Sequence, residues 1–117
     1  MHFHNNQQQA FANSIAAIDE GVEFVDATIH GMGRGAGNLQ TELVLKDTVP
    51  LDNIYEIMDF IQDYIKPIYK TNQNTWGYDI DYFLSGYLKM HPNYVVKMRD
   101  LEIDMKKRIF LIKKIKE

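Results

Sequence analysis

Two histidines near the start of the sequence, His2 and His4, carry side chains that can bind a metal ion. In an extended strand, residues i and i+2 point to the same face, so the two imidazoles would project side by side. A glycine-rich segment further along the chain ends in Asn38. An imidazole pair with a polar ligand from a neighbouring loop can hold a divalent metal and leave positions open for a substrate. His2, His4 and Asn38 are therefore the predicted metal ligands.

The composition is that of one modest globular domain. Of the 117 residues, 45% are hydrophobic and 25% are charged, which is ordinary for a folded protein. A net charge of -3 gives no support for nucleic-acid binding. Cysteine is absent from the sequence, which excludes disulfides and zinc–thiolate sites. No apolar run reaches the roughly 18 residues that cross a bilayer. We expect a cytoplasmic protein with no membrane and no nucleic-acid partner.

The first half of the sequence has an α/β pattern. Residues 1–4 form a short strand candidate, and residues 7–20 have the apolar spacing of a helix. Residues 22–29 are rich in β-branched side chains and predict a buried strand. A glycine loop at 31–37 then precedes a predicted helix at 39–46. Strand, helix, strand, loop and helix make up the repeating unit of a parallel α/β fold.

The second half is predicted to be all-helical. Residues 51–70 place their apolar side chains on one stripe, which predicts a long amphipathic helix. Trp76 is expected to anchor packing, and the basic helix at the end of the chain to dock through its apolar stripe rather than bind a membrane. Further segments are predicted as a polar loop at 71–75, a helix at 79–90 capped by Asp79, a helical segment opened by Pro92, and a helix at 101–116.

Two stretches of this sequence resemble a known family. The first lies within residues 1 to about 46 and contains HFHNN and ANSIAAIDEGVEFVDATIHGMGRGAGNLQTEL. It resembles the last two βα units of the metal-dependent aldolase and lyase superfamily, which includes 4-hydroxy-2-oxovalerate aldolase and HMG-CoA lyase. WGYDIDYFLSGYLKMHPNY resembles the helical C-terminal extension of its aldolase-like members. The resemblance implies a fragment of a TIM (β/α)8 barrel at residues 1–48 and an all-helical extension at 49–117.

The resemblance also implies roles for single residues. His2 and His4 would ligate a divalent metal, Mn²⁺ or Mg²⁺, and Asn38 would be a ligand or lie close to one. The metal would bind the carboxylate and keto oxygens of a small-molecule 2-oxo acid such as pyruvate, acting as a Lewis acid in carbon–carbon cleavage or condensation. Tyr82 is the nearest counterpart of a tyrosine that helps proton transfer, so it is the predicted catalytic residue.

The glycine loop supplies the predicted substrate-binding residues. Gly33 and Gly35 would let backbone N–H groups approach a substrate closely, and Arg34 would either contact an anionic substrate or be solvated. A dinucleotide-binding fingerprint competes with this interpretation, because Gly31 starts a G-x-G-x-x-A pattern and Asp52 follows at a fitting distance. The alternating glycines and the helical pattern around Asp52 do not fit that fingerprint.

Parts of the family's site have no counterpart in this sequence. The resemblance implies that a first barrel strand supplies a metal-binding Asp and an enolate-stabilising Arg, and neither precedes Met1. A complete barrel needs eight βα units and roughly 250 residues. We therefore expect a fragment that is inactive alone, with a complementing N-terminal barrel chain or a second copy as partner.

Two alternatives stay open at this point. An acetyl-CoA-dependent condensing synthase of the same superfamily usually shows HxHND and an acidic residue in the glycine loop, whereas Asn5, Asn6 and Arg34 here favour an aldolase. Alternatively, residues 51–117 dominate and the chain is a non-catalytic helical assembly module. Asp26, within the second predicted strand, is expected to have a structural role.

Overall fold

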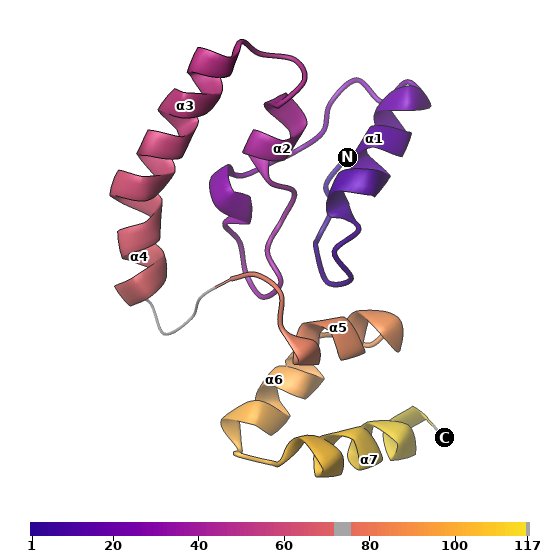
Figure 1. Ribbon diagram of the computed structural model, residues 1–117. Coiled ribbons are helices and arrows are strands. Elements are labelled where there is room, and N and C mark those ends of the chain that lie inside the picture. Colours follow the sequence, from indigo (N-terminus) through magenta and orange to yellow (C-terminus); the bar gives the residue numbers. More distant parts are fainter. Residues whose placement is uncertain (72–75, 117) are drawn as a thin grey trace.

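The computed structural model describes residues 1–71 and 76–116. Helices make up its regular structure, and α3 and α4 run together as one long helix (Figure 1). None of the helices in these residues is long and apolar enough to span a bilayer. The elements in order are α1 (Ala10–Asp19), η1 (Ile29–Gly31), α2 (Thr41–Leu45), α3 (Leu51–Phe60), η2 (Ile61–Ile65), α4 (Lys66–Thr71), α5 (Ile80–Tyr87), α6 (Asn93–Asp100) and α7 (Met105–Lys116).

The helix predicted at residues 7–20 is present as α1, but it begins later. Gln8 has φ 57°, and its N–H donates to the carbonyl of Asn5 at 3.0 Å, so this stretch is a turn. The side chain of Asn5 then accepts from the N–H of Ala10 at 3.1 Å and satisfies one free donor at the helix start. The predicted stop holds, because Gly21 follows the helix with φ 87°.

The strands predicted at residues 1–4 and 22–29 are wrong as continuous strands. In residues 1–71 and 76–116 the extended segments meet only at isolated bridges, parallel between His2 and Asp26 and antiparallel between His4 and Asn38. A further parallel bridge joins Thr28 to Gln40. Two or three short extended segments have too few neighbours to build a stable ladder. The barrel fragment expected at residues 1–48 is therefore represented among the described residues only by these single bridges and is not confirmed.

The helix predicted from residue 39 begins at Thr41 as α2. Leu39 is fully buried and extended, and its carbonyl accepts from the N–H of Thr28 at 2.9 Å. Thr41 in turn donates to the carbonyl of Thr28 at 3.0 Å. These bonds hold the segment extended, so tertiary pairing overrides the helical pattern for the first two residues.

The long helix predicted at residues 51–70 is present as α3, η2 and α4. Its middle turn is π-helical and ends two residues before Pro67, whose ring nitrogen cannot donate to the carbonyl one turn back. Ile61 and Ile65 on this turn are buried against Trp76, which confirms Trp76 as a packing residue. Of the predicted polar loop at 71–75, Thr71 ends α4 and residues 72–75 lie outside the described residues.

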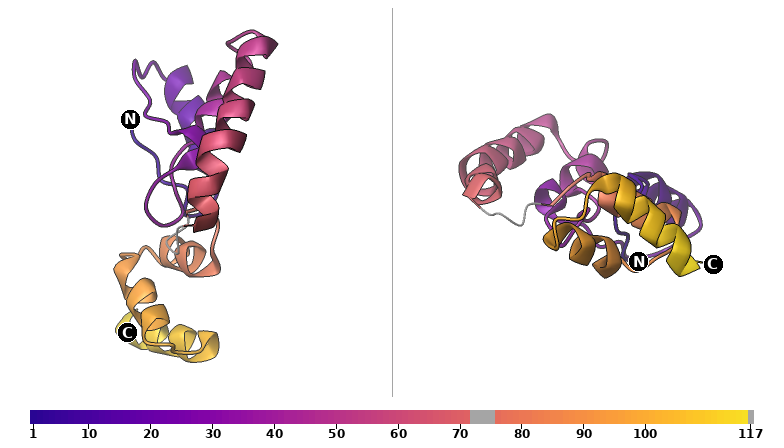
Figure 2. Two further views of the ribbon diagram at one scale, coloured as in Figure 1. Left: turned by 90° about the vertical axis from the view of Figure 1, so that its left-hand side faces the viewer. Right: turned by 90° about the horizontal axis from the view of Figure 1, so that it is seen from below.

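The predicted C-terminal helices are present as α5, α6 and α7. Asp79 caps α5 as expected, since its side chain accepts from the N–H of Asp81 at 2.8 Å. The fourth helix begins at Met105 rather than at residue 101, because Glu102 has φ 56° and breaks the helical path. Ile112 of α7 is fully buried, whereas Ile109, Phe110 and Ile115 of the same helix are exposed, so the predicted apolar stripe is covered only in part. The molecule is thin, with extents of 50 × 38 × 16 Å (Figure 2).

Candidate functional site

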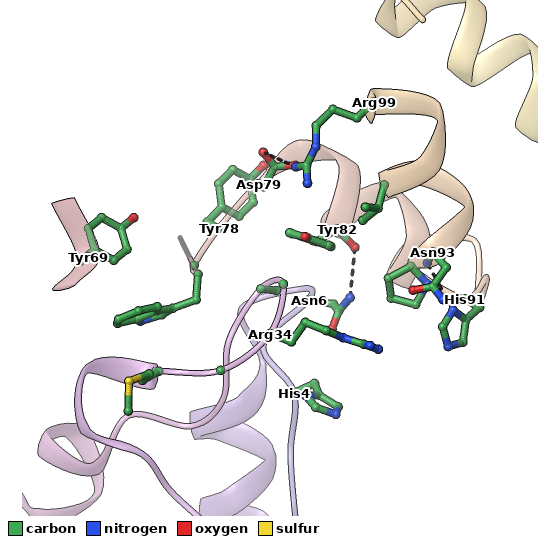
Figure 3. A pocket seen from close by; sticks show the side chains of 18 of the residues that line it. His4, Asn6, Arg34, Tyr69, Tyr78, Asp79, Tyr82, His91, Asn93 and Arg99 are labelled. Atoms are coloured by element: carbon green, nitrogen blue, oxygen red, sulfur yellow. Dashed lines mark hydrogen bonds and ion pairs between the residues drawn. The ribbon is translucent and has the colours of Figure 1, made fainter. Parts of the chain in front are cut away.

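An open cavity of about 1140 Å³ lies between the glycine loop and helices α5 and α6. Figure 3 shows side chains from both sides pointing into it, with Arg34 on one side and Arg99 on the other. The sequence segments that build it are far apart, so the fold gathers them. Five of the predicted site residues line this cleft: His4, Gly33, Arg34, Gly35 and Tyr82. His2 and Asn38 do not line it.

The two predicted histidine ligands lie side by side. Their ring centres are 4.8 Å apart, and the rings meet edge to face. Nδ1 of His2 lies 3.5 Å from the Oδ2 atom of Asp26. A carboxylate on one imidazole nitrogen fixes the ring and directs the other nitrogen toward a metal. The contact is long and the two side chains are 46% and 71% exposed, so Asp26 lies near enough to orient His2 but does not fix its ring in this structure. The sequence did not reveal this contact because it depends on the pairing of His2 with Asp26.

The side chain of Asn38 is held with its oxygen free. Its amide nitrogen donates to the carbonyl of Met32 at 3.1 Å, which fixes the orientation of the amide group. Its Oδ1 atom is buried and has no hydrogen-bond partner among the described residues. A buried acceptor without a partner is costly, and a bound cation or ligand donor would satisfy it. The antiparallel bridge between His4 and Asn38 places the two residues opposite each other.

The donor set of His2, His4 and Asn38 fits a divalent cation in its chemistry. Two imidazoles and an amide oxygen are ligands for Mn²⁺ and similar ions, and the orphaned Asn38 oxygen is the structural feature that favours one. Within residues 1–71 and 76–116, no group of three or more histidine, cysteine, aspartate and glutamate side chains is close enough to form a metal site. The amide of Asn38 is thus needed to complete three protein ligands.

Tyr82 of α5 is packed between the glycine loop and α6. A Cβ atom built on Gly35 would lie 3.1 Å from Cε1 of the Tyr82 ring. The amide nitrogen of Asn6 donates to the backbone carbonyl of Tyr82 at 3.4 Å, as Figure 3 shows. On the other side, Cζ of Arg99 is 5.7 Å from the centre of the same ring, within cation–π distance. Tyr82 is therefore half-buried in a defined position in the cleft.

Arg99 of α6 is a cleft residue that the sequence did not reveal. Its approach to the Tyr82 hydroxyl raises the pKa of its guanidinium above the usual value, although burial acts in the opposite direction. Asp79 and Asp81 contribute smaller increases. The nearest carboxylate oxygen, Oδ2 of Asp79, is 3.9 Å from Nη1, and 39% of the Arg99 side chain is exposed. A charged residue in the last turn of a polar helix is normally solvated, so no signal distinguished it.

Other residues complete the cleft. Arg34 is exposed and makes no ion pair with any residue in the described part of the chain. Trp76 lines the cleft as well as the core, and its indole N–H donates to the carbonyl of His30 at 2.8 Å. His91 also lines the cleft and accepts from the N–H of Asn93 at 3.2 Å. Asp52, the residue on which the dinucleotide interpretation depends, lies in the first turn of α3 and does not line the cleft.

Comparison with known proteins identifies relatives of this chain. It is 33% identical over 100 residues to a 4-hydroxy-2-oxovalerate aldolase of Desulfitobacterium hafniense, covering 81% of this chain and 29% of that protein. It is 38% identical over 98 residues to a 4-hydroxy-2-oxovalerate aldolase of Brevibacillus brevis, covering 80% of this chain and 28% of that protein. The chain thus spans less than a third of the length of these relatives.

A solved structure supports the same relationship. The chain is 35% identical to the N-terminal domain of a protein from Bacteroides vulgatus described as an aldolase, with a TM-score of 0.74, and the match covers 94% of this chain and 36% of that one. The model of the HMGL-like family matches residues 1–63, more than half of the sequence. This segment contains the histidine pair, the glycine loop and Asn38. The chain therefore belongs to the HMGL-like family.

Proposed function

We propose that this chain carries part of the site of a divalent-metal-dependent aldolase that acts on 2-oxo acids. The observation that carries the proposal is the cleft in which His4, the glycine loop and Tyr82 come together. The names of the relatives, 4-hydroxy-2-oxovalerate aldolase, support carbon–carbon lyase chemistry. The loop sequence around Arg34, which lacks an acidic residue, favours an aldolase over a condensing synthase.

In this proposal the glycine loop binds the 2-oxo acid. Gly33 and Gly35 allow the backbone to approach the substrate closely, and the exposed guanidinium of Arg34 binds its carboxylate. His2, His4 and Asn38 hold the divalent metal, with Asp26 orienting His2. When bound, the metal would supply Lewis acidity, which stabilises the negative charge that the pyruvate half of the substrate gains when the carbon–carbon bond breaks.

Tyr82 is proposed to carry the proton in the reaction. When the bond between carbons 3 and 4 of a 4-hydroxy-2-oxo acid breaks, its electron pair passes toward the 2-oxo group and the 4-hydroxyl loses its proton. The phenol oxygen of Tyr82 lies in the cleft beside the glycine loop. It can accept that proton while its own phenol proton passes to water, so that Tyr82 ends the step protonated. In the condensation direction Tyr82 returns the proton to the new hydroxyl group.

Residues 1–48 are proposed to be two βα units of a barrel and residues 49–117 its helical extension. A complementing chain would supply a carboxylate ligand to the metal, because the three proposed ligands carry no negative charge. Turnover by this chain alone is not expected. The proposal therefore needs a test that reads metal binding rather than activity.

Calorimetric titration with Mn²⁺ tests the metal site directly. The native chain is expected to bind the ion, and a His2→Ala, His4→Ala double variant is expected to lose binding because two ligands are gone. His91→Ala is a matched control, since it removes an imidazole of the cleft that lies outside the proposed ligand set. Equal binding by all three proteins, or by none, would contradict the metal site.

A second candidate function, helical assembly, is favoured by the apolar surface of the long helix. Large apolar side chains are exposed along α3, η2 and α4, and exposed apolar surface is typical of a site that another protein covers. We propose a second copy of this chain as the occupant. Tyr64→Glu should shift the sedimentation coefficient toward that of a monomer, and a native chain that is already monomeric would exclude the idea. The exposed residues are Leu51, Tyr55, Met58, Phe60, Tyr64 and Ile68.

A further inference from the structure

The wall of the cleft opposite the glycine loop is polar and charged. Helices α5 and α6 and the residues that flank them contribute two carboxylates and one guanidinium to this wall. An aldehyde with only a short apolar tail would gain little from such a wall, because the charged groups would lose water without finding partners. The residues concerned are Asp79, His91, Asn93, Arg99 and Asp100.

Arg99 is the group on this wall that is most available to a ligand. Its guanidinium lies over the Tyr82 ring, with 5.7 Å between Cζ and the ring centre. Its only ion pair among the described residues is the long contact of 3.9 Å with Asp79. One oxygen of Asp79 is already used to cap α5. A guanidinium carries five N–H donors in a fixed fork, so most of its donors remain free.

Arg34 and Arg99 come from opposite walls of the cleft. In Figure 3 the ring of Tyr82 lies between them, with Arg34 on the side of His4. An elongated substrate with an anionic group at each end could therefore contact both arginines and keep its reacting centre beside Tyr82. Paired arginines are well suited to carboxylate and phosphate groups, which they bind in a bidentate manner.

We propose that Arg99 binds an anionic group at the end of the substrate remote from the 2-oxo acid. The aldehyde that this aldolase releases or adds would then carry a carboxylate or a phosphate group. This inference rests on the proposed function only in assigning the anion to an aldol substrate. The binding of an anion by Arg99 can be tested without the reaction.

Matched 2-oxo acids test the proposal in the presence of Mn²⁺. 2-Oxoadipate and 2-oxohexanoate have the same chain length and differ only in a terminal carboxylate or methyl group. Binding can be followed by the fluorescence of Trp76, which lines the cleft and is the sole tryptophan. The native chain should bind 2-oxoadipate about 10- to 100-fold more tightly, the range expected for a charge-assisted hydrogen bond. Arg99→Gln should remove that preference.

Lys97→Gln is the matched control, because it removes a positive charge from the same helix without touching the cleft. It should keep the preference for 2-oxoadipate. Arg99→Lys keeps the charge but loses the fork, and should retain only part of the preference. Equal binding of the two 2-oxo acids by the native chain, or an unchanged preference in Arg99→Gln, would overturn the proposal.

Glutarate and inorganic phosphate separate this inference from the proposed function. Neither contains a 2-oxo group, so both report on the anion site without metal. If both 2-oxo acids fail to bind but one of these anions binds and is lost in Arg99→Gln, the inference holds and the proposed function fails. If Arg99→Gln binds glutarate and phosphate as tightly as the native chain does, the inference is overturned. Tighter binding of phosphate than of glutarate would identify a phosphate rather than a carboxylate as the recognised group.

Discussion

The α-carbon of Gly35 lies against the ring of Tyr82. A Cβ atom at Gly35 would be 3.1 Å from Cε1 and 3.2 Å from Cζ of that ring, closer than ordinary contact. The carbonyl of Gly35 also accepts from the N–H of Gly77 at 3.1 Å, just before α5. The glycine loop and the proposed proton carrier are thus in direct contact, so the position of one depends on the other.

Gly35→Ala is expected to displace Tyr82 and destabilise the chain. The new methyl group would press on the ring, and φ of 71° at this position is itself unfavourable for alanine. Together these effects should lower the free energy of unfolding by about 2 kcal/mol. Urea denaturation followed by tryptophan fluorescence measures the loss, and NMR of the Tyr82 ring measures the displacement.

Gly21→Ala separates the two effects. Gly21 has φ 87°, but a Cβ atom there would meet nothing within 4 Å. Its substitution should therefore cost only the backbone strain, about 1 kcal/mol, and leave the Tyr82 ring resonances unchanged. If Gly35→Ala and Gly21→Ala have equal effects on stability and on Tyr82, the contact between the loop and the ring has no energetic significance.

Gly33→Ala should weaken metal binding although it removes no ligand. A Cβ atom at Gly33 would lie 2.4 Å from Nδ2 and 2.9 Å from Cγ of Asn38, so the amide group would have to move. Moving it breaks the bond from Nδ2 to the carbonyl of Met32 and turns the free oxygen away. Loss of such a supporting contact typically weakens metal binding about 10-fold or more.

Calorimetry with Mn²⁺ checks this prediction, with Asn38→Ala as the reference for complete loss of the ligand. Gly33→Ala should lie between the native chain and Asn38→Ala. Native affinity in Gly33→Ala would show that the orientation of the Asn38 amide does not matter to the ion.

Helix positions could be predicted well from sequence because they depend on local patterns. The apolar stripe of residues 51–70 and the cap at Asp79 act within a few residues, and the structure has helices in both places. The strands could not be predicted in the same way. A β-branched segment such as 22–29 becomes a strand only where neighbours pair along its length, and here the neighbours meet it at single bridges.

The candidate site shows the same division. His4, the glycine loop and Tyr82 follow from motifs, and the structure brings them together in one cleft, while their roles there stay predictions. Asp26 and Arg99 do not follow from any motif. Their significance depends on the register between residues 2 and 26 and on the angle between α5 and α6. Both are tertiary properties that a single sequence does not display.

The contribution of Arg99 to stability should not change between about pH 6 and 9. Its contact with Tyr82 raises the pKa of the guanidinium above the usual value. A pKa that is raised in the folded protein stabilises the fold at every pH at which the guanidinium is charged in both the folded and the unfolded chain. This stabilisation is lost only when the pH rises above the usual arginine pKa. The difference in unfolding free energy between the native chain and Arg99→Gln should therefore be constant over this range. Urea titrations at three pH values measure it, and a difference that changes with pH would indicate a second titrating partner.

The ion pair between Asp81 and Arg108 should be the strongest electrostatic link between α5 and α7. The side chains are 3% and 14% exposed, and Arg108 also donates from Nε to the carbonyl of Ile103. Arg108→Met leaves a buried carboxylate without its cation and should cost about 3 kcal/mol or more, whereas adding Asp81→Asn should recover part of that loss. A double-mutant cycle from urea denaturation measures the coupling between the two residues.

The exposed pair of Lys46 and Asp47 is the matched control, and its coupling should stay below about 1 kcal/mol. Equal coupling in the two pairs would show that burial does not strengthen the link between α5 and α7.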